Sequence, residues 1–268
     1  MGPKNDRLGF ILNWGIVFDT LGKNLTGPNN LIIYDLEENR VHCQVDISKK
    51  FATVGRGGMQ DLEFDEDGNV FVIETYGGIL LRVSSDCSTV EEWYKDPLLA
   101  PTAGFTGLAR VNDIILLVDQ TKKKLYRTRT GLEGKGKAET VEITGLHPNS
   151  AAQNMSVTDG LYCPPKYAGN CCLLSDNDIG TTVFWSDDGW FSAKIHSPIP
   201  NKFLNDQPRG SSTASVEMAG RIFVITEWFM DGAKAQRGAG KPGDRTEFPM
   251  QDITALVDER CKPNIIMA

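Results

Sequence analysis

Four apolar segments of the sequence each end on a carboxylate residue. The runs NVFVIE, DIILLVD, NCCLLSD and RIFVITE end on Glu74, Asp119, Asp176 and Glu227. Since β-branched and aromatic residues between Gly, Asn and Asp predict strands, each carboxylate is expected where a strand passes into a loop. A carboxylate in that position can assist proton transfer to a ligand. The open alternative is that it accepts hydrogen bonds from the backbone amides of the turn.

The elements that would position these acids are short strands that recur along the chain. Residues 61–64, 69–74, 79–83 and 90–94 have the composition of four successive strands, and glycines lie in the first two turns between them. Four antiparallel strands of this length form one blade of a β-propeller. The segment that starts at Asp61 therefore predicts the unit that the rest of the chain repeats.

This blade pattern predicts an all-β, six-bladed propeller of which about five blades are visible. Second strands are expected at 9–13, 69–74, 113–119, 170–176 and 221–227, third strands at 31–36, 79–83, 124–128, 183–186 and 253–257, and first strands at 61–64, 107–111, 155–158 and 213–217. Because no first strand precedes residues 9–13, we expect residues 1–268 to form a single propeller domain that lacks its N-terminal blade. The alternative is a complete five-bladed ring with irregular end blades.

In a propeller, the loops before first strands and after second strands open on one face, around the central channel. We expect this face to hold an aromatic set and a polar set, as in an apolar pocket with a few directed polar groups. The aromatic set is Trp14, Tyr76, Phe105, Trp228 and Phe229, and the polar set is Arg56, Gln60, Asp61, Thr106, Gln120, Asn154, Asp176, Asn177, Ser212 and Glu227. Packing between blades is the alternative for the aromatic residues. Two long loops are expected, at residues 15–30 and 229–250, and the second is interpreted as a lid over the channel or a surface insertion.

Composition and charge exclude several classes of protein. The net charge of −7 argues against a general nucleic-acid binder. The sequence contains no run of 18 apolar residues, so we expect no membrane span. The one basic cluster, Lys122–Lys124, is expected at a solvated turn, with peripheral lipid contact as the alternative. Six cysteines form no CxxC pair. Buried free thiols are the expectation for them, and a disulfide of Cys163 with Cys171 or Cys172 is the alternative.

The sequence predicts neither a standard hydrolase nor a cofactor site. It contains no GxSxG or HExxH motif. A divalent ion held by the strand-end acids would be an alternative, since Ca²⁺ takes carboxylate and amide oxygens. Gluconolactonase-type propellers typically begin a first strand with an EGP-like motif, whereas this chain has Met59, Gln60 and Asp61 there. We therefore expect no cofactor and no metal. Two glycosylation tripeptides, at Asn24 and Asn154, leave the compartment open between secreted and cytoplasmic.

Several longer runs resemble a known family. GNVFVIETYGGILLRVSSDCSTVEEW, GFTGLA, VFWSDDGWFSAKI and the closing block FMDGAK…GDRTEFPMQDITAL are similar to the Mala s allergen-like family of six-bladed propellers. That family includes a yeast surface allergen and a fungal protein of trichothecene clusters, and it looks related to fungal hetero-Diels–Alderase propellers. The resemblance implies a fungal source and either lipid binding or ring closure in secondary metabolism. Members begin with about one more blade, in agreement with the strand count.

These observations predict a cofactor-independent cyclase that acts on a hydrophobic terpenoid or polyketide intermediate in the channel. Holding two reacting ends in a near-attack conformation lowers the barrier by up to ~7–11 kcal/mol, and such a reaction needs no nucleophile. Gln60, Thr106 and Asn154 would donate hydrogen bonds, and Asp119, Asp176 and Glu227 would assist proton transfer. The binding residues would be Trp14, Arg56, Tyr76, Phe105, Gln120, Asn177, Ser212, Trp228 and Phe229. The alternatives are a non-catalytic lipid or metabolite carrier and a metal-dependent lactonase.

Overall fold

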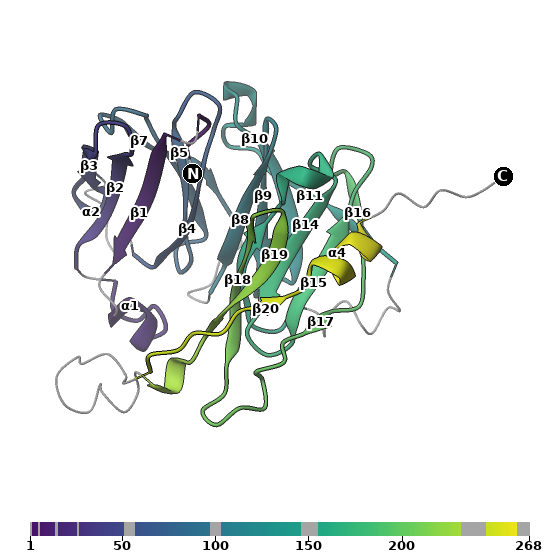
Figure 1. Ribbon diagram of the computed structural model, residues 1–268. Helices are drawn as coiled ribbons and strands as arrows, with labels where there is room; N and C mark the ends of the chain where they lie inside the picture. Colours follow the sequence, from purple (N-terminus) through teal and green to yellow (C-terminus); the bar gives the residue numbers. More distant parts are fainter. Residues whose placement is uncertain are drawn as a thin grey trace. The chain divides into compact units, whose positions relative to one another are not determined.

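Most of the regular secondary structure in the described residues is β-strand (Figure 1). A computed structural model describes residues 2–4, 6–13, 16–25, 27–50, 57–96, 103–145, 155–231 and 245–261. Trp14, Arg56 and Asn154, which the sequence assigns to the site, lie outside these residues. The chain divides into two compact units, residues 1–140 and 141–268. None of the helices in the described part of the chain has the length and apolarity that a bilayer crossing requires. A single domain over residues 1–268 stays a prediction.

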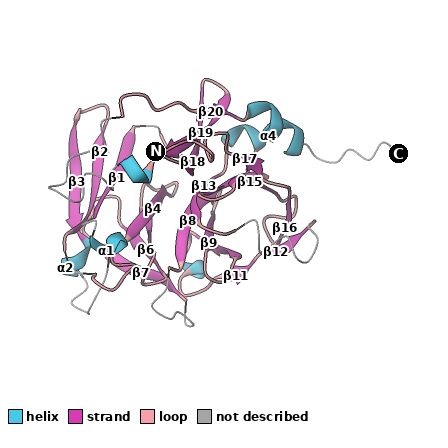
Figure 2. Ribbon diagram, turned by 90° about the horizontal axis from the view of Figure 1, so that it is seen from below, coloured by secondary structure: helices cyan, strands magenta, loops and turns pink. Residues whose placement is uncertain are grey.

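The first unit contains three antiparallel sheets in chain order. They are β1 (Arg7–Asn13), β2 (Asn29–Asp35) and β3 (Arg40–Asp46); β4 (Met59–Phe64), β5 (Val70–Glu74), β6 (Ile79–Val83) and β7 (Val90–Lys95); and β8 (Phe105–Val111), β9 (Ile114–Asp119), β10 (Lys124–Arg129) and β11 (Glu139–Thr140). The short helices are α1 (Ile16–Asp19), α2 (Ile47–Lys50) and η1 (Leu132–Gly134). The inner strands β4 and β8 lie side by side, as inner strands of successive propeller blades do (Figure 2).

The strand β1 has the position of a second strand, as the sequence predicts. Its last residue, Asn13, exchanges hydrogen bonds with the backbone of Met59, where β4 begins, so β1 runs toward the end of the unit at which β4 starts. Within the described residues β1 pairs only with β2. The Leu36 N–H donates to the Asp6 carbonyl, so the hydrogen-bonded pairs of the β1–β2 ladder are those of every second residue counted from Asp6. Gly9 and Ile11 fall between these pairs and direct their backbone groups away from β2. This edge is therefore open among the described residues, and Phe10 and Leu12 beside it are 46% and 53% exposed.

The second unit contains two sheets. Their strands are β12 (Glu142–Thr144), β13 (Thr158–Tyr162), β14 (Cys171–Asp176), β15 (Gly180–Trp185), β16 (Ser192–Ile195) and β17 (Ile199–Pro200) in the first, and β18 (Ser211–Met218), β19 (Arg221–Glu227) and β20 (Gln251–Asp252) in the second. The helices are η2 (Pro165–Tyr167) and α4 (Thr254–Arg260). The inner strands β13 and β18 are neighbours, and the β12–β16 pair is parallel whereas the other pairs are antiparallel.

Apolar residues of adjacent sheets form the cores. In the first unit, Leu31 and Ile33 of β2 pack with Val72 and Leu81, and Phe71 packs with residues of β8 and β9. In the second unit, Leu173 and Val183 pack with residues of β19 and α4. Side chains alternate between the two faces of a strand, so a strand with both faces covered reads as a continuous apolar run. This explains why the second strands are the clearest segments in the sequence.

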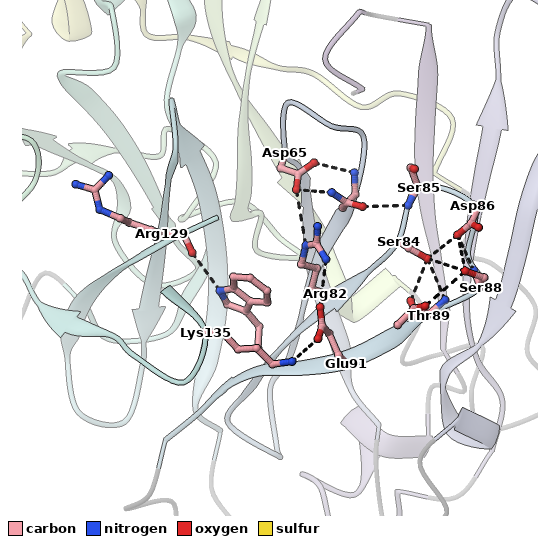
Figure 3. A network of polar contacts seen from close by, with 12 residues as sticks. Asp65, Arg82, Ser84, Ser85, Asp86, Ser88, Thr89, Glu91, Arg129 and Lys135 are labelled. Atoms are coloured by element: carbon pink, nitrogen blue, oxygen red, sulfur yellow. Dashed lines mark hydrogen bonds and ion pairs between the residues drawn. The ribbon is translucent and has the colours of Figure 1, made fainter. Parts of the chain in front are cut away.

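A network of polar contacts fixes the turns of the second sheet at the end remote from the predicted site (Figure 3). Asp65 accepts hydrogen bonds from the backbone and side chain of Asn69, and the Asn69 side-chain oxygen accepts the Ser85 N–H. Glu91 binds both Arg82 and Lys135. The acidic turn DEDGN therefore has a structural role, because the Asp65 carboxylate accepts backbone N–H groups of the turn, as Asp side chains commonly do in turns.

Two strands that the sequence predicts are placed differently. Residues 254–257 lie in the helix α4 rather than in a strand, and Ile253 is its N-cap. Ile253 and Val257, four residues apart, turn to the same side and are buried against β19. The Asp252 carboxylate accepts the Thr254 N–H at the start of this helix. The first strand expected at 155–158 begins only at Thr158 and extends to Tyr162.

The expectation of free thiols is wrong, because all six cysteines form disulfides. Cys43 pairs with Cys87, Cys163 with Cys172, and Cys171 with Cys261, with Cα–Cα distances of 5.9, 4.1 and 5.7 Å. The first disulfide joins two sheets of the first unit. The third joins β14 to the end of α4. Cys171 and Cys172 are neighbours on a strand, so they point to opposite faces and take different partners.

Candidate functional site

The inner strand β4 carries two of the predicted polar residues of the first unit. The Thr75 hydroxyl donates to Gln60 Oε1 at 2.8 Å. Asp61 Oδ2 accepts the Leu108 N–H at 3.0 Å and so connects β4 to β8. Thr106, the third predicted polar residue, is buried at the start of β8. Gln60 is thus fixed by its neighbour, and Asp61 stabilises the contact between inner strands.

Tyr76 lies at the turn after β5, between glycines. Its ring centroid is 6.0 Å from that of Phe18. A Cβ atom at Gly58 would lie 2.8 Å from the Tyr76 ring, and Gly58 has a φ of +76°, a conformation that L side chains rarely adopt. Gly22, with a φ of +77°, approaches the ring as well. Burial raises the pKa of the Tyr76 hydroxyl above its usual value of 10.0, so this side chain stays a neutral donor.

Phe105 and Asp119 lie in the interior of the first unit. Phe105 is fully buried and contacts Tyr94 and Tyr126, with centroid distances of 6.2 and 6.1 Å. It therefore packs in the core, which is the alternative that the sequence left open for the aromatic set. Asp119 is also fully buried and accepts the Lys122 N–H at 2.9 Å. Gln120 is half-buried, and its N–H donates to the Gly104 carbonyl.

Lys122 is not the solvated side chain that the sequence predicts. It forms an ion pair with the buried carboxylate of Asp96 and lies 3.9 Å from that of Asp119, and only 22% of its side-chain surface is exposed. Burial raises the pKa of Asp119, although the Lys122 amide and ammonium oppose the shift. Burial and the charges of Asp96 and Asp119 raise the pKa of Tyr126 to about 12. This cluster stabilises the junction between the second and third sheets.

In the second unit, Asp176 connects the end of β14 to the preceding loop. Its Oδ2 accepts the N–H groups of Ser156 and Val157 at 2.6 and 3.1 Å, and its Oδ1 accepts that of Asp178 at 2.9 Å. Asn177 donates to the Val157 carbonyl and to Asp159. Burial raises the pKa of Asp176 although the three amide hydrogen bonds lower it. The amide bonds support the structural alternative for this strand-end acid.

Trp228 is the centre of an aromatic cluster after β19. Its ring centroid lies 5.7 Å from that of Phe203 and 6.4 Å from that of Phe248. The Arg245 guanidinium lies 4.2 Å from the ring centroid and is paired with Asp231. The indole is 4% exposed, and its N–H has no hydrogen-bond acceptor in the described part of the chain. A buried indole N–H usually has an acceptor, so this donor suits a ligand.

The residues on either side of Trp228 are exposed, whereas Trp228 itself is buried. Phe229 is 49% exposed, and Met230 beside it is 58% exposed. Glu227 ends β19 with its side chain at the surface, yet desolvation by the surrounding residues raises the pKa of its carboxyl group above the usual 4.5. A carboxyl group with a raised pKa holds its proton at higher pH and can donate it.

Sequence reasoning missed the residues that surround Trp228. Phe203, Arg245 and Phe248 come from loops whose positions no local pattern predicts. Thr226 could have been found, because it is two residues from Trp228 and alternate residues of a strand face the same side. Among the described residues, no group of three or more His, Cys, Asp or Glu side chains is placed to hold a metal ion. A pocket of about 230 Å³ lies elsewhere, at β10 and η1, and no predicted site residue lines it.

The five sheets, with neighbouring inner strands in each unit, define the protein as an all-β propeller with few helices. No protein-family model matches the chain. The Malassezia sympodialis allergen Mala s 1 has a similar structure, with a TM-score of 0.70 and 18% identity over 92% of this chain and 73% of the allergen chain. This likeness supports the fold.

Two curated fungal proteins have similar sequences. Trichothecene biosynthesis protein 14 of Trichoderma arundinaceum is 29% identical over 94% of this chain, and core trichothecene cluster protein 14 of Fusarium sporotrichioides is 26% identical over 97%. The chain spans 67% and 66% of the lengths of these relatives. The matches support the family that the sequence motifs indicated. They are consistent with a role in fungal secondary metabolism.

Proposed function

We propose that the protein binds a hydrophobic, oxygen-bearing intermediate of fungal secondary metabolism and promotes its ring closure without a cofactor. The similarity to trichothecene cluster proteins supports the metabolic setting. The observation that carries the proposal is the environment of Trp228, a buried aromatic surface with an N–H that has no acceptor among the described residues. It offers both an apolar wall and a directed donor, the combination typical of small-molecule sites.

The proposed chemistry needs three contributions from the chain. Trp228 and Phe248 would hold the two reacting ends in a near-attack conformation, which in favourable cases is worth ~7–11 kcal/mol. The indole N–H would stabilise negative charge that develops on a carbonyl or alkoxide oxygen. Glu227, the exposed neighbour of Trp228 at the end of β19, would donate a proton where the ligand reaches the surface, since its raised pKa preserves the acid form to higher pH.

The first unit offers a separate set of donors and aromatic groups. Gln60 and Thr106 are the proposed donors there, and Tyr76 is the proposed aromatic contact. Trp14, Arg56 and Asn154 stay predictions outside the described residues. We assign Asp119 and Asp176 to fold stabilisation instead of proton transfer. Asp119 Oδ1 accepts the Lys122 N–H, and the Lys122 ammonium lies 3.9 Å from Asp119 Oδ2. Both oxygens of Asp176 accept backbone amides.

A carrier that binds the same class of molecule without turnover is the second candidate. The exposure of Phe229, Met230 and Phe248, at 49%, 58% and 65%, favours it, because an apolar surface of this kind also suits a lipid or a stored metabolite. Both functions would use Trp228, and they differ in whether the bound molecule changes.

The proposal is tested by incubating the purified protein with metabolite extracts of the fungus that encodes it, from a strain in which the gene is deleted. Ring closure by cycloaddition or oxa-cyclisation conserves mass, so the expected result is loss of one compound and gain of an isomer. Trp228→Phe and Glu227→Gln should slow the conversion, whereas Met230→Leu should not. Binding of a compound that is recovered unchanged would favour the carrier. Failure to bind or convert any compound would refute the proposed function.

A further inference from the structure

Among the described residues, two hydroxyl groups near Trp228 have no hydrogen-bond partner. Ser212 and Thr226 are buried, with exposed fractions of 0% and 7%, and neither hydroxyl is bonded within the described part of the chain. The two residues are directly opposite each other in the β18–β19 ladder. Such cross-strand neighbours have Cβ atoms about 4.5–5.5 Å apart. Their hydroxyls are therefore close together on one face of the sheet.

Gly210 allows Thr226 and the Trp228 indole to approach each other. A Cβ atom at Gly210 would lie 2.7 Å from Thr226 Cγ2 and 3.0 Å from Trp228 Cε2, the ring carbon bonded to the indole nitrogen. Only glycine permits Thr226 and the N–H edge of the indole to approach the same point of the backbone. We call Ser212, Thr226 and Trp228 the hydroxyl–indole cluster.

The facing sheet adds further hydroxyl groups. Ser175 and Thr181 are paired across β14 and β15 and are fully buried, and neither hydroxyl is bonded within the described residues. Each lies two residues from a core residue, Leu173 or Val183, that packs against β19. They therefore point toward the β18–β19 sheet. Polar groups of both sheets thus face the same layer.

Buried hydroxyl groups that are unbonded among the described residues are unusual. Buried polar groups nearly always have a partner, and a buried group without one lowers stability. None of the three residues in the cluster is charged. The nearby Arg245 stacks on the indole and is neutralised by Asp231. The cluster therefore offers hydrogen bonds to a neutral group, but no free positive charge that would compensate the negative charge of a carboxylate or phosphate.

We infer that the hydroxyl–indole cluster binds the neutral oxygen atom, hydroxyl or carbonyl, of an otherwise apolar ligand. The inference deepens the proposed function, because the ligand is taken to be the substrate of the same site. The apolar remainder of the ligand would lie against Phe203 and Phe248, which flank Trp228. Recognition of a ligand that lacks the oxygen should be weaker, because the buried groups would stay without partners.

The test compares two probes of equal chain length, farnesol and the hydrocarbon β-farnesene, by quenching of tryptophan fluorescence. Wild-type protein should bind farnesol about tenfold more tightly, the equivalent of one good hydrogen bond. Ser212→Ala and Thr226→Val should reduce this preference to about threefold or less. Ser215→Ala is the matched control, since Ser215 is a buried serine of the same strand whose hydroxyl is also unbonded among the described residues, but it is opposite Val224 and so lies further along the ladder from Trp228. It should retain the preference.

Unfolding temperature separates ligand recognition from a structural role. Because the two hydroxyls have no partner in the part of the chain that the structure describes, Ser212→Ala and Thr226→Val should leave the unfolding temperature unchanged or raise it. Equal affinity for the two probes, absence of binding by both, or a lower unfolding temperature in both variants would overturn the inference. Those results would not bear on whether the protein converts compounds of the fungal extract. If wild-type protein prefers farnesol but converts no compound of the extract, ring closure alone is refuted.

Discussion

Removal of the Cys171–Cys261 disulfide should destabilise the protein more than removal of either of the other two. The three pairs are 90, 44 and 9 residues apart in sequence for Cys171–Cys261, Cys43–Cys87 and Cys163–Cys172. In the chain-entropy model, closing loops of these lengths stabilises the folded state by about 4.6, 4.0 and 2.6 kcal/mol. The order of the effects follows from the loop lengths alone.

The Cys171–Cys261 disulfide also holds α4 against the sheet. Cys171 is fully buried and Cys261 is 4% exposed, and both belong to the core cluster that contains Ile253 and Val257. The Asp258 carboxylate adds hydrogen bonds from Lys166 and the Tyr167 hydroxyl. When the disulfide is removed, α4 should lose protection from hydrogen exchange before the sheets do.

The assay is urea unfolding of three double variants, each with one cysteine pair replaced by serine, after peptide mapping of the disulfides in the wild type. The variant without Cys171 and Cys261 should lose about 4.6 kcal/mol of unfolding free energy, and the variant without Cys163 and Cys172 about 2.6 kcal/mol. Equal losses, or a wild-type map that shows other pairings, would refute the reasoning. Since disulfides persist in oxidising compartments, we also expect the wild type to fold fully only there.

Three further predictions follow from single positions. Gly210→Ala should lower the unfolding free energy by ~1–3 kcal/mol in thermal denaturation, because its Cβ would lie 2.9 Å from Phe203 Cβ and 2.7 Å from Thr226 Cγ2; unchanged stability would contradict the close approach. Glu227→Gln should gain stability relative to wild type as pH rises through and above 4.5, since a raised pKa in the folded state costs stability once the group ionises; a pH-independent difference would show that burial does not shift this group. Phe10→Lys should reduce self-association in sedimentation velocity with little change in stability, because Phe10 is 46% exposed beside the edge of β1 that is unpaired among the described residues; equal association of both proteins would argue against that edge.

Much of the fold was accessible from the sequence because strand signals are local. The β5, β9, β14 and β19 segments are apolar runs with covered faces, and the structure confirms them within one residue at either end. The helix α4 was missed because its β-branched residues suggest a strand, whereas burial of Ile253 and Val257 against β19 decides the outcome. Tertiary contacts of this kind are not visible in a local pattern.

The disulfides also show which contacts a local sequence pattern predicts and which it does not. Once β13 is known to pair Leu161 with Leu174 and Tyr162 with Leu173, Cys163 must be opposite Cys172. The sequence suggested this pair but could not choose between Cys171 and Cys172 without the register. The Cys171–Cys261 pair spans 90 residues, and no local signal predicts it.

The residues of the site could be predicted only in part from the sequence. Trp228 and Ser212 were predicted from their places in loops of one face, whereas Phe203 and Phe248 come from distant segments of the chain and meet Trp228 only after folding. Phe105 was predicted as a site wall from its place before a strand, yet it packs in the core between Tyr94 and Tyr126. Loop position indicates a face, but side-chain direction depends on the packing of the neighbouring sheet.

The central claim is tested most directly by native mass spectrometry of the protein purified from its fungal host, followed by denaturing extraction of the bound compound. The account predicts one equivalent of a cyclised, oxygen-bearing terpenoid or polyketide, which is lost in the Trp228→Ala variant. A phospholipid, an unmodified fatty acid or a divalent ion in its place would contradict the account.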